Sequence, residues 1–191
     1  STSKSYMWLY RTSGCAEQPI VLYEYQPSRK TEHAEAFLKD FSGWLHADGY
    51  QGYHKLPEKI RVVGCWAHVR RKFDEALQTL PKDKRQGSPA AVGECYCTKL
   101  FQLEETLSEL TAEERYTKRL ELEKPVLDAL LAWAEDASVK TAPKSALGKA
   151  LHYLREQWPY LVCYLEDGRL ELSNNRAERS IKPFVMGRKN W

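Results

Sequence analysis

The sequence that decides the fold is GWLHADGY, residues 43–50, together with IRVVGCWAHVRRKF, residues 60–73. In the first stretch a short apolar run ends at Asp48, which is followed directly by a glycine. In the second, the apolar run 60–65 leads into a helical pattern over residues 66–80. Strands and helices that alternate at such short spacing predict an α/β sheet, with functional side chains at the strand ends.

The residues before this stretch predict a hairpin and a helix. Tyr6–Tyr10 and Pro19–Tyr25 are aromatic-rich runs bounded by turn residues, which is typical of two antiparallel strands. Thr31–Lys39 has apolar residues at helical spacing, with Ser28 or Thr31 as its expected cap.

The residues after it are predicted to be mainly helical. Leucines recur at helical spacing, and TAEE, residues 111–114, matches a capping box. Two helices are expected to stop at a proline: the helix over residues 144–158 at Pro159, and a capped helix that begins in SNN, residues 173–175, at Pro183.

The composition excludes several classes of protein. The chain has 191 residues, of which 42% are hydrophobic and 12% aromatic, too many for a disordered chain. No apolar run approaches the roughly 18 residues of a membrane span, and the first residues do not resemble a signal peptide. Five cysteines, an odd number at irregular spacing, favour reduced thiols in a cytoplasmic protein.

The small net charge hides a segregation of charge. The formal charge is only +3, yet residues 55–72 hold six Lys and Arg against one Glu, and residues 176–191 hold five against one. Residues 102–136 hold four basic residues against ten acidic ones. This pattern predicts a surface that binds a polyanion beside a separate acidic helical element. Solvated charged faces are the alternative interpretation.

Two acidic residues stand out by their position. Asp48 ends a predicted strand, and Glu178 lies in the first turns of a capped helix among cationic residues. Together they suggest oxygen ligands for Mg²⁺ or a similar hard cation. The alternative for Glu178 is an ordinary salt-bridged helix residue. Arg70–Lys72 and Arg188–Trp191 combine basic and aromatic or amide side chains, which suits phosphate contacts and base stacking.

Four ordered motifs carry a resemblance that covers essentially the whole chain. HADGYQGY (46–53), GCWAHVRRKF (64–73), SNNRAERSIKP (173–183) and GRKNW (187–191) resemble the insertion-sequence transposases of the IS-sixty-six family. The resemblance implies a ribonuclease-H-like core built on one mixed sheet, here incomplete because its first strand is missing. It also implies an Asp-Asp-Glu triad, in which Asp48 matches the second Asp and Glu178 the Glu, with a large helical insertion between them. It further implies two Mg²⁺ or Mn²⁺ ions, transposon-end DNA and other transposase protomers as partners, and no membrane.

The same resemblance assigns the remaining candidate residues. The expected DNA-contacting residues are Arg70, Arg71, Lys72, Asn174, Asn175, Arg176, Arg179, Lys182, Arg188 and Lys189. A helix cap is the alternative role for the two asparagines. The core is expected to comprise residues 1–84 and 160–191, with a helical insertion over residues 85–159.

The string Cys65-x-x-His68 resembles one found after the second Asp in several transposase groups. Packing, orientation of the strand end and metal binding all remain open for it, including a zinc set with Cys95 and Cys97.

The family's first Asp has no counterpart here, because it lies on a strand before the one that corresponds to Tyr6-Met7-Trp8. The sequence is therefore expected to be a fragment of a longer transposase, inactive on its own and lacking the family's amino-terminal helix-turn-helix and zinc-binding regions. Two alternatives come from other classes: a non-catalytic DNA-binding or assembly module, and a structural helical interaction domain.

Overall fold

A computed structural model describes residues 6–49 and 51–188, with only the backbone at residues 51 and 183–188. Its first part is an antiparallel hairpin of β1 (Tyr6–Arg11) and β2 (Val21–Gln26), in which Trp8 is paired with Glu24. Helix α1 (Thr31–Phe37) packs on one face of the hairpin, where the Tyr10 and Phe37 rings stack with centroids 3.6 Å apart. The aromatic side chains of the predicted strand thus attach the helix to the hairpin.

A second sheet follows, and it is parallel. Strand β3 (Gly43–His46) pairs with β4 (Ile60–Val63) in the register Gly43 to Ile60. The connection between them contains the 3₁₀ helix η1 (Gln51–Lys55). Because the two strands are parallel, the chain leaves both at the same edge of the sheet: towards Asp48 from β3, and into helix α2 (Trp66–Gln78) from β4.

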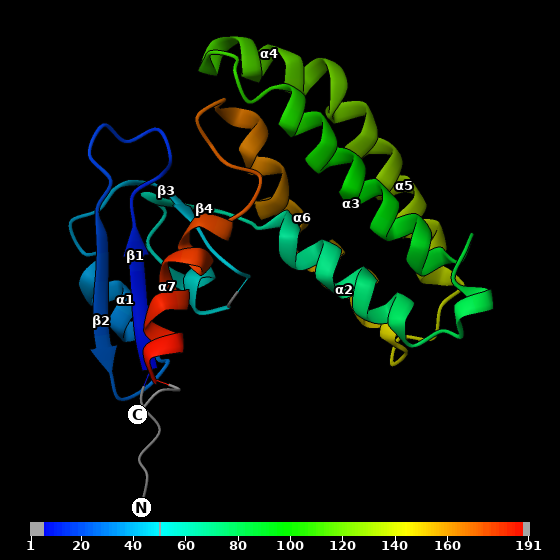
Figure 1. Cartoon of the computed structure of the whole chain (residues 1–191), viewed down its shortest axis with the longest axis horizontal. Helices are drawn as coiled ribbons and strands as arrows, with labels where there is room; N and C mark the ends of the chain where they lie inside the picture. The colour runs from blue at the N-terminus through cyan, green and yellow to red at the C-terminus, as the bar shows by residue number, and fades with distance from the viewer. Residues whose placement is uncertain (1–5, 50, 189–191) are drawn as a thin grey trace, which may run out of the picture.

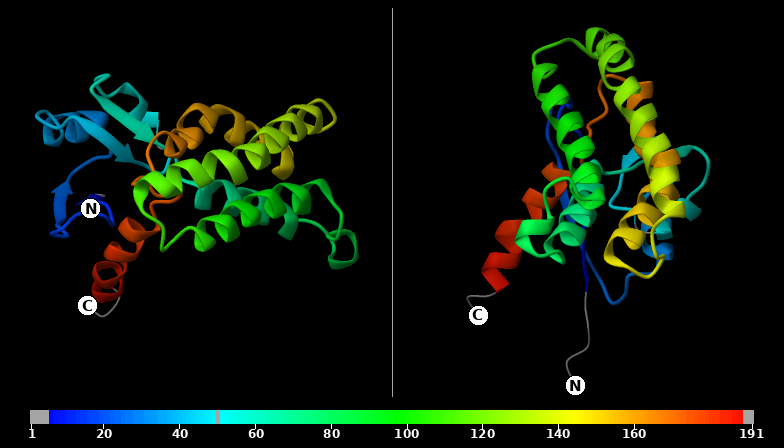
Figure 2. Two further views of the ribbon diagram at one scale, coloured as in Figure 1. Left: turned by 90° about the horizontal axis from the view of Figure 1, so that it is seen from above. Right: turned by 90° about the vertical axis from the view of Figure 1, so that its right-hand side faces the viewer.

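Most of the remaining chain is helical. The helices are α3 (Pro89–Thr106), α4 (Ala112–Leu122), α5 (Lys124–Val139), α6 (Ala146–Leu161) and α7 (Asn175–Arg188), with 3₁₀ helices η2 (Lys82–Lys84) and η3 (Val162–Glu166). Helices α2, α3, α5 and α6 pack side by side into an elongated bundle that extends away from the two sheets, whereas α7 lies beside β1 (Figures 1 and 2).

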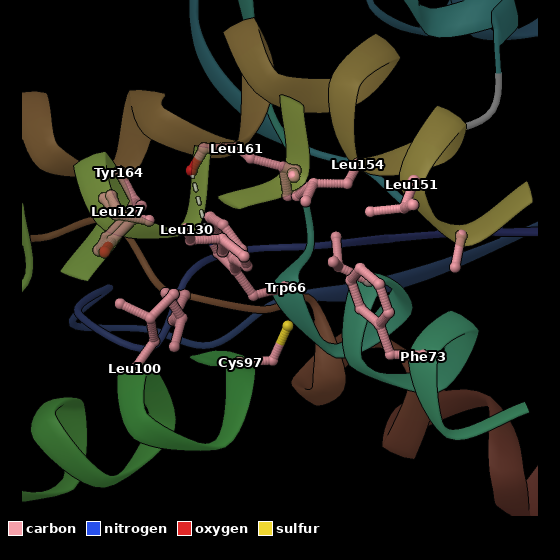
Figure 3. Packing of buried hydrophobic residues seen from close by; sticks show 14 of the residues in the cluster. Trp66, Phe73, Cys97, Leu100, Leu127, Leu130, Leu151, Leu154, Leu161 and Tyr164 are labelled. Carbon is pink, nitrogen blue, oxygen red and sulfur yellow. Dashed lines mark hydrogen bonds between the residues drawn. The ribbon is translucent and has the colours of Figure 1, made fainter. Parts of the chain in front are cut away.

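The bundle encloses the main hydrophobic core. Trp66 and Phe73 of α2 are fully buried against Leu100 of α3, Leu130 of α5 and Leu154 of α6 (Figure 3). The Trp66 indole N–H donates to the carbonyl of Leu161 over 3.0 Å, so this large side chain buries no unpaired donor. The first turn of α2, which follows the parallel sheet directly, is thereby fixed to the end of α6.

The predicted α/β class is confirmed, but the described residues form two separate two-stranded sheets instead of one mixed sheet. The hairpin, the helix after it and the strand–helix unit at residues 60–78 lie where the sequence predicted them. The Thr111 capping box is also present, since Thr111 Oγ1 accepts from the Glu114 N–H and the Glu114 carboxylate accepts from the Thr111 N–H.

Three local predictions were wrong. Helix α1 begins after Lys30 without a side-chain cap, and the Ser28 hydroxyl instead bonds to His33 Nε2 over 2.8 Å. Neither proline ends its helix: α6 continues through Pro159 to Leu161, and the backbone of α7 continues through residue 183 to residue 188. In α6 the tertiary contacts of buried Leu161 keep the last turn helical against the local preference of proline.

Candidate functional site

Three elements bring the candidate site together. Asp48 follows β3, His68 lies in the first turn of α2, and Glu178 lies in the first turn of α7. The loop after β3 is tied to β4, because the Ala47 N–H donates to the Val63 carbonyl over 3.0 Å. The start of α2 is tied to the residues before α7, because the Trp66 N–H donates to the Leu172 carbonyl over 3.1 Å. Residues far apart in the sequence therefore share one edge of the parallel sheet.

Gly49 allows the loop after β3 to turn against α6. Its φ is +78°, in the left-handed region that disfavours a side chain. A Cβ at this position would lie 2.6 Å from the Tyr153 hydroxyl oxygen, and that hydroxyl donates to the backbone carbonyl of Asp48 over 3.2 Å. Asp48 and Gly49 thus both contact Tyr153, and the Asp48 side chain is half-buried.

Glu178 is held by two residues of α2. His68 Nε2 lies 3.2 Å from Glu178 Oε1, and Arg71 Nη2 lies 3.4 Å from Glu178 Oε2. Burial lowers the pKa of His68, while the negative charges of Glu178 and, more weakly, Asp48 act in the opposite direction. His68 therefore contacts Glu178 directly, and the charge of Asp48 also acts on its ring.

Cys65 has a structural position in this arrangement. Its buried thiol precedes α2 and accepts the Asn174 N–H at 3.4 Å, and burial raises its pKa. The zinc set with Cys95 and Cys97 does not form: Cys97 is buried in the bundle core and Cys95 is exposed. Within residues 6–49 and 51–188, no group of three or more His, Cys, Asp or Glu side chains is arranged to hold a metal ion.

The three consecutive basic residues of α2 point in different directions. The Arg70 guanidinium lies 4.9 Å from the centre of the Phe101 ring, and the Lys72 ammonium lies 5.6 Å from that of Tyr153. Arg71 is the one that reaches Glu178. All three are exposed, but the Arg71 side chain also neutralises a candidate carboxylate, a role that the sequence did not indicate.

The basic residues of α7 flank a groove of about 300 Å³ between this helix and the helices α3 and α4. Asn175, Arg176 and Arg179 line it, together with Arg115 and Arg119 of α4. Arg176 is paired with Glu171 over 2.5 Å, and Arg179 is exposed.

The remaining DNA-contact candidates lie in α7 or next to it in the sequence. Lys182 is exposed. The Asn174 carbonyl accepts the Glu178 N–H at 3.2 Å, whereas its buried side-chain Oδ1 has no hydrogen-bond partner among the described residues. Only the backbone of Arg188 is described, and Lys189 lies outside the described residues.

Sequence reasoning missed residues that position the site from outside it. His46 Nε2 accepts the Glu171 N–H at 3.2 Å, and burial lowers the pKa of His46 to about 4, so its ring stays neutral and able to accept. The motif that contains Asp48 also contains His46, so the signal was present. Arg11 donates to Ser180 Oγ over 2.6 Å and Tyr23 to the Ser180 carbonyl over 2.7 Å, which attaches α7 to the hairpin. No local pattern could have indicated a contact across about 160 residues.

None of the helices in the described part of the chain has both the length and the apolar character of a membrane span. No solved structure matches the chain.

Curated relatives and a family model do match. Two uncharacterized proteins of Sinorhizobium fredii (strain NBRC 101917 / NGR234), y4hP and y4qI, are each 31% identical to it over 97% and 99% of its length. A third, y4jD from the same strain, is 33% identical over 90% of the chain. The chain spans about a third of the length of these relatives, at 37%, 36% and 34%. The model of the transposase IS66 family matches residues 1–191, and the chain belongs to that family.

Proposed function

We propose that this chain forms the catalytic region of a transposase that cleaves DNA strands and joins them to new sites, with Asp48 and Glu178 as two of its catalytic carboxylates. The observation that carries the proposal is the arrangement of three elements at one edge of the parallel sheet: Asp48 directly follows β3, and His68, in the first turn of the helix that follows β4, pairs with Glu178 over 3.2 Å. Membership of a transposase family supplies the reaction class.

The proposed architecture is a ribonuclease-H-like core with a helical insertion over residues 85–159. Such a core requires a further strand, carrying the first Asp, next to the strand that precedes Asp48. The pairing of the strands is compatible with this arrangement, because among the described residues β1 has a ladder with β2 alone and β3 has a ladder with β4 alone.

The donor chemistry of Asp48 and Glu178 fits Mg²⁺ or Mn²⁺, because hard divalent cations take carboxylate oxygens. When bound, such ions activate a water or a 3′-hydroxyl and stabilise the leaving oxygen of the phosphodiester. The residues of this chain would bind and orient: Asp48 and Glu178 as ligands, and His68 and Arg71 as the side chains that hold Glu178. A third carboxylate, on the further strand, completes the proposed set.

DNA is the proposed substrate, and the exposed basic residues are its proposed contacts. Arg70, Lys72, Arg179 and Lys182 are exposed on α2 and α7, the same two helices that carry His68 and Glu178. Positive charge close to the carboxylates would offset the phosphate charge of a DNA strand at the site. Other protomers are proposed partners, since joining reactions act on paired DNA ends.

The test is strand cleavage by the protein as its gene encodes it, on DNA that carries the element's ends. We expect Asp48→Asn and Glu178→Gln each to reduce Mn²⁺-dependent cleavage by more than about 100-fold, beyond the 10–100-fold effect of changing a residue that only supports a ligand. DNA affinity should stay within about twofold, because the phosphate contacts that dominate affinity remain.

The matched controls are Asp40→Asn and Glu75→Gln, which change exposed carboxylates outside the site and should retain full cleavage. Full cleavage by either site variant would refute the assignment of that residue. DNA binding without any metal-dependent cleavage in the unmodified protein would refute the proposed reaction.

A further inference from the structure

The residues between α6 and α7, 162–174, are called here the linker segment, and helix α4 holds them from one side. Arg119 of α4 is fully buried and donates to three linker carbonyls: Tyr164 at 2.9 Å, Asp167 at 3.2 Å and Leu170 at 2.8 Å. Its guanidinium is also paired with Glu104 of α3 through bonds of 2.6 and 2.8 Å. A planar guanidinium with five donors is suited to such a set of acceptors.

A second arginine of α4 adds to this attachment. Arg115 donates to the Gly168 carbonyl over 3.2 Å and, with its other nitrogens, to carbonyls of the turn between α3 and α4. Gly168 lies so close to α4 that a Cβ there would lie within 1.8 Å of the Ala112 carbonyl oxygen. The linker segment therefore contacts the backbone of α4 directly, and no side chain can be added at residue 168 without moving one of them.

From the other side the linker segment is bonded to residues adjacent to the candidate site. The Glu171 N–H donates to His46, two residues before Asp48. The Leu172 carbonyl accepts from Trp66 and the Asn174 N–H donates to Cys65, both within three residues of His68. Glu178 then follows in the first turn of α7, with its N–H bonded to the Asn174 carbonyl. One segment thus connects α4 to all three parts of the site.

We propose that Arg115 and Arg119 are positioning residues for Glu178: by fixing the linker segment to α4, they set where the first turn of α7 stands relative to His68 and Asp48. The proposal rests on the proposed function in so far as Glu178 is a metal ligand. It gives the helical region a role in the reaction, which is to hold one catalytic carboxylate in place. A misplacement of about 1 Å at a reacting group costs about 100-fold in rate, so the tightness of this attachment matters.

The experiment uses Arg115→Met and Gly168→Ala in the protein as its gene encodes it, because removal of the fully buried Arg119 could prevent folding. The control is Lys118→Ala, an exposed residue of the same helix that pairs with Glu121. Three quantities are measured: amide hydrogen exchange of residues 164–178, Mn²⁺ affinity, and the rate and DNA affinity of strand cleavage.

Both variants should raise amide exchange in residues 164–178 while leaving the β1–β2 hairpin unchanged. Mn²⁺ affinity should fall about tenfold and the cleavage rate about 10–100-fold, with DNA affinity within about twofold. Arg115→Lys, which keeps one donor group near Gly168, should recover part of the rate and of the Mn²⁺ affinity. Lys118→Ala should match the unmodified protein throughout.

The proposal is overturned if both variants keep the exchange protection and Mn²⁺ affinity of the unmodified protein, even where the melting temperature falls, because the arginines would then only stabilise the bundle. Failure of the proposed function is seen separately: the unmodified protein would neither bind Mn²⁺ nor cleave DNA. In that case amide exchange still decides whether α4 holds the linker segment and the first turn of α7.

Discussion

At the scale of single residues, the most unusual group is Glu123, which is fully buried at the junction of α4 and α5. Its Oε2 accepts the Tyr164 hydroxyl over 2.6 Å. Burial, reinforced by the negative charge of Glu104, raises the pKa of Glu123 to about 8. The carboxyl group is therefore largely protonated in the folded protein at neutral pH, although in the unfolded chain it is ionised.

This protonation makes stability depend on pH in a defined direction. Between the unfolded pKa of 4.5 and the folded pKa of about 8, the folded state binds more protons, so the free energy of unfolding falls as pH rises. For one group the slope is at most about 1.4 kcal/mol per pH unit. Glu123→Gln should remove this slope, so the variant should gain stability relative to the unmodified protein from pH 5.5 to 8.5.

Urea denaturation at several pH values in that range measures the difference. Glu121→Gln is the control, because it makes the same change at an exposed position two residues away and leaves the buried Glu123 in place. Parallel curves for Glu123→Gln and the unmodified protein would show that Glu123 is ionised in the folded state.

At the scale of elements, the sequence predicted what depends on neighbouring residues. Short apolar and aromatic runs located all four strands, and the Thr111 capping box marked the start of α4. The ends of α6 and α7 were predicted wrongly, since proline weakens a helix locally and contacts such as those of Leu161 outweigh that preference. The residues that pair with Glu178 could not be predicted from local sequence patterns either, because Arg71 lies 107 residues away from Glu178 in the sequence.

The turn after β3 offers a test at this scale. Gly49 and Gly87 both have left-handed φ angles, +78° and +72°, but a Cβ at Gly87 would meet nothing within 4 Å. Gly87→Ala should therefore cost only the backbone strain, about 1–2 kcal/mol. Gly49→Ala should cost more, because it also displaces Tyr153 from the Asp48 carbonyl.

Urea denaturation measures the free energy of unfolding of the two variants, and the difference between them reports the contribution of the contact between the Asp48 loop and α6. Equal destabilisation of the two variants would mean that this loop can move away from Tyr153 without cost. A larger loss of stability for Gly49→Ala, accompanied by reduced Mn²⁺ affinity, would show that the contact of the Asp48 loop with Tyr153 of α6 helps to position Asp48.

At the scale of the whole molecule, the segregation of charge predicted from the sequence is a division between helices. The consecutive basic residues lie on α2 and the basic carboxy-terminal part on α7, whereas most of the acidic residues of the stretch 102–136 lie on α3, α4 and α5, of which α3 packs directly against α2. The separation of the hairpin from the parallel sheet was not foreseen. Which strands pair with one another is a long-range property of the fold, and the residue pattern within a single strand does not determine it.

DNA binding by the basic surface is tested by its salt dependence. Each lysine or arginine that contacts a phosphate contributes about one unit to the slope of log affinity against log salt. Arg179→Ala and Lys182→Ala should each reduce the magnitude of the slope by about one, measured by fluorescence anisotropy with a labelled duplex. Lys140→Ala, in an exposed pair with Asp136 at the far end of α5, should leave the slope unchanged. An equal reduction of the slope in Lys140→Ala would show that DNA is attracted non-specifically to the whole molecule.

The attachment of α7 to the hairpin also has a consequence for the order of folding. The bond from Arg11 to Ser180 closes a loop of 169 residues, whereas the bundle combines contacts between consecutive helices with the contact of α2 and α6, in which Trp66 and Leu161 are only 95 residues apart. Because distant contacts form only after a large loss of chain entropy, we expect the bundle to assemble early and α7 to dock late. Glu178 would then reach His68 in one of the last steps, so the bundle would be in place before the carboxylates meet.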